Sequence, residues 1–142
     1  MRTELRELVT RLGITAVFVT HDQTEAMSMS DMIAVMSEGV IEQYDVPEKV
    51  YSSPVTEFAA RFVGSSNWID KSRMFRPESA SDVPVENAVR FDTVVKSVQF
   101  LGGSYQIMLD HCGEIWSFLS NKRMSVGNTL PIYINKSNII TL

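Results

Sequence analysis

The chain has 142 residues, of which 44% are hydrophobic and 21% charged, and its formal net charge is −4. This length allows one ordinary domain or two small ones, and no apolar run approaches the roughly 20 residues needed to cross a bilayer. The negative charge argues against nucleic acid as a partner, while the single cysteine, Cys112, excludes an internal disulfide and favours a reducing compartment such as the cytoplasm.

Charge is distributed unevenly along the chain. Residues 1–64 carry five Lys or Arg against ten Asp or Glu, whereas residues 65–142 carry eight against seven. The change in charge coincides with a small polar stretch, GSSN, that is typical of a linker. The sequence therefore predicts two units, with a boundary after Gly64.

The first predicted elements are a helix and a strand. Apolar side chains recur at the spacing of one helix face from Leu5 to Leu12, and Gly13 suits the C-terminal cap of that helix. Residues 14–20, ITAVFVT, are apolar nearly throughout and rich in β-branched and aromatic types. This pattern predicts a strand that is covered on both faces.

A histidine stands at the end of this predicted strand. After His21 a second helix is expected to run to about Ser30, with Asp22 as its cap and Glu25 in a variant of the capping box. In open α/β sheets, ligands lie beyond the carboxyl ends of strands, so His21 is a candidate ligand-binding residue beside a helix N-terminus that favours anions. The alternative from these residues alone is that His21 closes a turn or contributes to capping.

The rest of the first unit alternates strands and helices. Strands are predicted at residues 31–36 and 40–44, and helices at 47–53 and 58–63. This rhythm is typical of an α/β layer with a parallel sheet. The unit also holds four methionines that are interpreted as flexible core packing rather than as a metal site: Met27, Met29, Met32 and Met36.

The second unit is predicted to be all β. Four alternating segments, FDTVVKSVQF, SYQIMLD, EIWSFLS and TLPIYIN, are separated by turns that contain glycine. Several short strands of this kind indicate a small barrel or sandwich. The fold class predicted for the whole chain is thus a partial α/β layer followed by a small all-β barrel.

Several side chains of the second unit are weaker candidates for binding. Five aromatic residues could form a ligand face but are more often barrel core: Trp68, Tyr105, Trp116, Phe118 and Tyr133. His111 and Cys112 lack partners at zinc-type spacing, so a solvent-facing turn is predicted and no metal site is expected. Lys122-Arg123 could meet an anion or simply form a solvated turn.

The order of motifs in residues 1–64 resembles the later part of the ATPase subunit of ATP-binding cassette (ABC) importers, closest to the maltose, polyamine, sulfate and ferric-iron branch. The motifs that carry this resemblance are Val19-Thr-His-Asp22, Gln23-Thr-Glu-Ala26, Ile33-Ala-Val-Met36, Gly39-Val-Ile-Glu-Gln43, Pro47-Glu-Lys-Val-Tyr51 and Phe58-Ala-Ala-Arg-Phe-Val-Gly64. The resemblance implies a P-loop ATPase fold for this part.

The same resemblance implies a role for His21. It corresponds to the switch histidine, which reaches the γ-phosphate of ATP, so His21 is expected to be both catalytic and nucleotide-binding. The implied cofactors of the parent protein are ATP and Mg²⁺. The implied partners are a second ATPase subunit, membrane permease subunits and, indirectly, an external solute-binding protein, which would hold the parent on the cytoplasmic face of the membrane.

Other motifs of that family are absent from the 142 residues. The P-loop, the LSGGQ signature and the Walker B strand would all precede residue 1 if the resemblance holds. The chain alone is therefore expected neither to bind ATP tightly nor to hydrolyse it. Because the strands at 14–19 and 32–36 would then lack neighbours, the chain is also expected to self-associate or exchange strands.

The second unit resembles the accessory domain of the same importers, an oligonucleotide/oligosaccharide-binding (OB) type barrel called TOBE. The tripeptide Arg76-Pro-Glu78 matches a recurrent motif of that domain. Only eleven residues separate Gly64 from Arg76, fewer than in many relatives, so the first strands of a full barrel could be missing or borrowed. One compact barrel is expected.

Two other classes of function compete with a transport ATPase fragment. The chain could be a free-standing regulatory or small-ligand-binding domain, with the ATPase-like part as a scaffold. It could also be an OB-type nucleic-acid binder, although its acidic charge and the lack of a basic aromatic strand face argue against this class.

Overall fold

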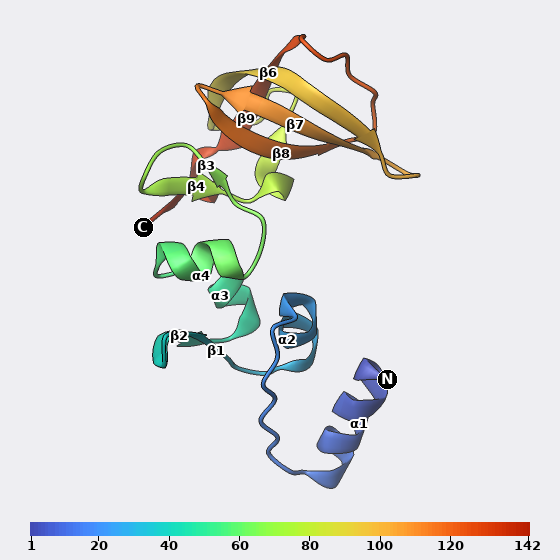
Figure 1. The fold of residues 1–142 in the computed structure, drawn as a ribbon, viewed down its shortest axis with the longest axis vertical. Coiled ribbons are helices and arrows are strands. Elements are labelled where there is room, and N and C mark those ends of the chain that lie inside the picture. The colour runs from blue at the N-terminus through green and yellow to red at the C-terminus, as the bar shows by residue number, and fades with distance from the viewer. The chain divides into compact units, whose positions relative to one another are not determined.

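The computed structural model describes all residues, Met1–Leu142, and the chain forms two compact units, Met1–Gly64 and Ser65–Leu142 (Figure 1). Each unit has its own buried apolar cluster. None of the helices is long and apolar enough to cross a membrane.

The first unit combines four short helices with one β-hairpin. Its elements are α1 Arg2–Leu12, α2 Gln23–Met29, β1 Ile33–Ser37, β2 Val40–Asp45, α3 Pro47–Ser52 and α4 Glu57–Phe62. The ends of these elements follow local chemistry. Gly13 ends α1 in the left-handed region at φ 64°, Pro47 opens α3, and the Thr56 hydroxyl accepts a hydrogen bond from the Ala59 N–H at the start of α4.

The core of the first unit is small. Alternate residues of β1, Ile33 and Val35, point inward and pack with side chains of the last two helices and the residue that follows them: Val50, Ala59 and Val63. Of the four methionines predicted to pack there, Met29 is buried and Met27 is half-buried against the cluster. Met32 and Met36 are exposed, so that prediction is wrong for these two, because the alternation of the strand turns Met36 outward.

The predicted strand at 14–20 does not form. Its backbone makes no strand pairing, and the only backbone hydrogen bond recorded for it joins the Ile14 N–H to the Val9 carbonyl. A strand needs a neighbour to accept and donate its backbone hydrogen bonds, and no segment of the chain takes that place. Its apolar side chains are consequently exposed: Val17 is 88% and Val19 is 98% accessible.

The parallel sheet expected in the first unit is also absent. The strands β1 and β2 pair with each other in antiparallel register, from Ile33 opposite Asp45 to Ser37 opposite Val40. The two residues between them, Glu38 and Gly39, both have positive φ, as a tight hairpin turn requires. With residues 14–20 outside any sheet, a hairpin is the only strand pairing that this unit contains.

The second unit is built from antiparallel strands. They are β3 Asn67–Trp68, β4 Arg73–Phe75, β5 Ala80–Ser81, β6 Ala88–Phe100, β7 Tyr105–His111, β8 Glu114–Ser120, β9 Thr129–Asn135 and β10 Ile140–Thr141, with 3₁₀ turns at Pro77–Ser79 and Lys136–Asn138. Five strands form one sheet in the order β5-β9-β6-β7-β8, and three form another in the order β10-β4-β3. The larger sheet curls (Figure 1), which is compatible with a small OB-like barrel.

The curled sheet encloses the larger core. The residues of this core that are nearly inaccessible come from alternate positions of the long strands and from β4: Phe75, Val95, Ile107, Leu109, Trp116, Ile132 and Ile134. The rings of Phe75 and Trp116 meet edge to face, with centroids 4.8 Å apart. The prediction that aromatics form core is confirmed for Trp68, Trp116 and Phe118, while Tyr105 and Tyr133 are half-buried.

Side-chain hydrogen bonds join the smaller sheet to the edge strand β8. The amide of Asn67 bonds both the N–H and the carbonyl of Ser117, and the Trp116 indole donates to the Trp68 carbonyl at 2.8 Å. Arg76, which is 3% exposed, donates from Nη1 to the Ser65 carbonyl and the Ser66 hydroxyl. The arginine of the Arg-Pro-Glu motif thus secures the beginning of the second unit.

Candidate functional site

His21 lies in a turn immediately before α2 and is exposed. It follows the extended segment 14–20, so the predicted setting at the carboxyl end of a sheet strand is not formed within this chain. The structure records no hydrogen bond or ion pair for its imidazole, which leaves both ring nitrogens open to a group from outside. A ring nitrogen of an imidazole can donate or accept a hydrogen bond.

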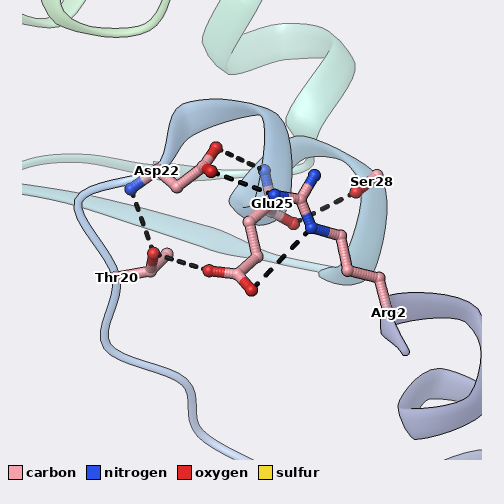
Figure 2. Close-up of polar contacts among 5 residues, drawn as sticks. All are labelled: Arg2, Thr20, Asp22, Glu25 and Ser28. Carbon is pink, nitrogen blue, oxygen red and sulfur yellow. Dashed lines mark hydrogen bonds and ion pairs between the residues drawn. The ribbon is translucent and has the colours of Figure 1, made fainter.

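The residues on both sides of His21, Thr20 and Asp22, make hydrogen bonds within the turn (Figure 2). The Thr20 hydroxyl donates to Glu25 Oε2 at 2.7 Å and accepts a hydrogen bond from the Asp22 N–H at 3.0 Å. Asp22 Oδ1 in turn accepts from the Glu25 N–H at 3.0 Å. The predicted cap by Asp22 is therefore confirmed.

The capping arrangement differs from the usual capping box in one respect. In that motif the acidic side chain at the third helical position accepts from the backbone N–H of the cap residue. Here the Asp22 N–H donates instead to the Thr20 hydroxyl, and the Glu25 carboxylate accepts a hydrogen bond from that hydroxyl. Thr20 is thus an intermediary that the sequence reasoning missed, although its place two residues before a capping aspartate is typical of a hydroxyl turn.

Two arginines of α1, Arg2 and Arg6, donate hydrogen bonds to residues before, in and after α2. Arg2 donates to Asp22 Oδ2 at 3.0 Å, and its Nε lies 4.0 Å from Glu25 Oε1. Figure 2 draws these three side chains together. Arg6 donates to the Met29 carbonyl and, at 2.7 Å, to Asp31 Oδ1. Neither arginine was a sequence candidate, because their targets lie about twenty or more residues along the chain.

Charge in the turn is partly balanced. The Glu25 N–H and, secondarily, the Arg2 guanidinium hold the pKa of Asp22 below its ordinary value of 3.8. The Asp22 carboxylate accepts a hydrogen bond from the Glu25 N–H, and the Asp22 carbonyl accepts one from the Ala26 N–H. These two N–H groups at the start of α2 are therefore already bonded within the chain. The imidazole of His21 is an exposed polar group of this turn that has no recorded hydrogen bond.

The prediction of a solvent-facing turn at His111 and Cys112 is confirmed for Cys112, which lies exposed in the β7–β8 turn at φ 50°. It is wrong for His111, which is the half-buried last residue of β7, because its ring packs against the core. The His111 ring stacks on Trp116 at 4.5 Å, and its Nδ1 lies 3.1 Å from the Asp92 carbonyl oxygen. No three His, Cys, Asp or Glu side chains come together in a way that could hold a metal ion.

Lys122 and Arg123 lie in an exposed turn after β8. Lys122 lines a hollow of about 250 Å³, together with polar side chains of both edge strands and their flanks: Ser81, Asp82, Ser120 and Asn121. The hollow mixes one acid with one base and holds no buried charge. No protein-family model matches the chain.

Proposed function

We propose that this chain is the C-terminal portion of the ATP-hydrolysing subunit of an ABC-type importer, in which His21 contacts the terminal phosphate of ATP. The observation that supports this most directly is the exposed imidazole of His21, free of internal partners on a turn whose two flanking residues are bonded. A hydrogen bond from such an imidazole would stabilise charge that develops on the phosphate during phosphoryl transfer.

The residues present fit one contact with a nucleotide rather than a whole ATP site. The chain has no Gly-rich loop that could surround phosphates with backbone N–H groups and no cluster of ligands for Mg²⁺. Under this proposal a preceding ATPase segment supplies those groups, and ATP with Mg²⁺ binds to the combined site. His21 then donates to the phosphate and helps hold the attacking water.

The exposed segment 14–20 agrees with such an arrangement. Its backbone hydrogen-bonding groups and apolar side chains are the features of a strand that completes a sheet contributed by other residues. The proposed partners of the assembled subunit are a second copy of itself, the permease subunits at the cytoplasmic face of the membrane and, through them, an external solute-binding protein. The proposed role of residues 65–142 is that of a TOBE-type regulatory barrel.

The test joins or co-expresses the chain with a segment that carries a P-loop, a signature motif and a Walker B strand. We expect this assembly to hydrolyse Mg-ATP, and His21→Ala to reduce turnover by about 100-fold or more, because one positioned donor contributes that much in comparable sites, with ATP binding largely retained. Gln23→Ala, at an exposed neighbouring position, is the matched control and should leave turnover unchanged.

Full turnover by the His21→Ala assembly would reject the role of His21. Failure of the chain to associate with any such segment would instead favour the alternative function, a free-standing regulatory or small-ligand-binding domain. The separate core of residues 65–142 is the observation that favours this alternative.

A further inference from the structure

We infer that Thr20 and Glu25, supported by Arg2, are positioning residues that determine the direction in which His21 is presented. The inference rests on the proposed function, since it concerns the orientation of the same imidazole. None of the three side chains needs to touch the nucleotide. They act through the backbone on either side of His21.

The first step of the argument is the hydrogen bond across His21. When the Thr20 hydroxyl accepts from the Asp22 N–H, it closes a ring of atoms that contains the backbone of His21. Such a hydroxyl turn restricts φ and ψ of the enclosed residue. The Cα–Cβ bond of His21 therefore has a defined direction even though its ring has no recorded hydrogen bond or ion pair.

The second step is the control of the Thr20 hydroxyl. This hydroxyl donates to Glu25 Oε2, with the two oxygens 2.7 Å apart, which leaves an oxygen lone pair for the Asp22 N–H. A bond to a carboxylate is among the stronger hydrogen bonds in proteins. Glu25 thus selects the rotamer and the donor direction of Thr20.

The third step is the anchoring of Glu25 itself. Its backbone belongs to α2, where its N–H is bonded by Asp22, and its carboxylate faces the Arg2 guanidinium. The Arg2 guanidinium also donates to Asp22, so one cation from α1 contacts the carboxylates of both Asp22 and Glu25 (Figure 2). Loss of the Thr20 hydroxyl would break the only direct connection from this network to the residue before His21.

The experiment compares identical chemical changes at two threonines of the full 142-residue chain. Thr20→Val removes the hydroxyl while keeping a β-branched side chain, and Thr24→Val makes the same change at an exposed position of α2 that has no recorded side-chain hydrogen bond. Nuclear magnetic resonance relaxation of the His21 amide and ring is the readout. We expect Thr20→Val to lower the order of His21, Thr24→Val to leave it unchanged, and Thr20→Ser to restore it.

A second readout is the hydrolysis of Mg-ATP by the assembly described above. Thr20→Val should lower kcat by about tenfold with little change in KM, because misplacement of a catalytic group acts mainly on the chemical step, and Thr20→Ser should recover most of the rate. Unchanged order of His21 in Thr20→Val would overturn the positioning role. If His21→Ala retains full turnover while Thr20→Val still disorders His21, the proposed function fails and the structural link stands.

Discussion

The side-chain amide of Asn67 pairs with the backbone of Ser117 as a neighbouring strand would. Its Nδ2 donates to the Ser117 carbonyl at 2.9 Å, and its Oδ1 accepts from the Ser117 N–H at 2.8 Å. Asn67 is buried, and Ser117 belongs to the edge strand β8. One residue thereby covers part of an edge that would otherwise expose unpaired backbone groups.

This pairing predicts that Asn67 is important for the stability of the second unit. Asn67→Ala leaves the half-buried Ser117 N–H and carbonyl without their side-chain partner, which should cost about 1–3 kcal/mol of unfolding free energy. Urea unfolding followed by tryptophan fluorescence is suitable, because both tryptophans, Trp68 and Trp116, lie in this unit. Asn121→Ala, at an exposed turn, is the control, and equal stabilities of the two variants would contradict the prediction.

Stability at acid pH should depend on Asp70. The N–H of Ser72 and the Arg73 side chain lower the pKa of Asp70 from 3.8 to about 2. Because the folded state binds this proton more weakly than the unfolded state, the contribution of Asp70 is complete above pH 3.8 and disappears as the pH falls to about 2. The gap in stability between the unsubstituted chain and Asp70→Asn should therefore narrow across this range.

Unfolding free energies measured at a series of pH values check this expectation. Asp82→Asn is a suitable comparison, since it removes a carboxylate that receives no recorded hydrogen bond. The prediction is contradicted if the difference in unfolding free energy between the unsubstituted chain and Asp70→Asn stays constant from neutral pH to pH 2. The stability of the turn between β3 and β4 would then not depend on the charge of this carboxylate.

The exposed segment 14–20 should cause self-association. Val17 and Val19 are almost fully accessible, and the backbone around them is unpaired. The double variant Val17→Lys, Val19→Lys places charges along this edge and should shift sedimentation toward the monomer. Val126→Lys, at an exposed apolar site of the second unit, is the control. Monomeric behaviour of the unsubstituted chain across a concentration series would refute the expectation.

The β1–β2 turn offers a stabilising substitution. Glu38 has φ 49°, a conformation that costs glutamate more than asparagine, and Gly39 follows it at φ 79°. Glu38→Asn creates the Asn-Gly pair favoured in such turns and should stabilise the first unit by about 0.5 kcal/mol. Glu42→Asn, in the strand β2, is the matched control and should not stabilise.

Thermal unfolding followed by circular dichroism compares these two variants. An equal effect of both substitutions would mean that the backbone conformation of Glu38 is not the cause.

Local chemistry was sufficient to predict most elements. The helix caps at Gly13 and Asp22, the opening of α3 at Pro47 and the strands that became β6 to β9 all follow from side-chain types and spacing within a few residues. The burial of alternate residues such as Ile132 and Ile134 likewise follows from the two-residue period of a strand. These features depend on neighbours in the chain, which is why the amino-acid pattern contains them.

The sequence by itself determined where this chain turns, caps and alternates, and it singled out His21 through the motif around it. Only the tertiary structure decided that residues 14–20 remain unpaired, that Asn67 covers Ser117, and that Arg2 holds the turn beside His21. The physical reason is that a strand, a covered edge and an ion pair each require a second group in space. Propensity can favour a conformation for one segment, but it cannot supply the partner that satisfies its hydrogen bonds.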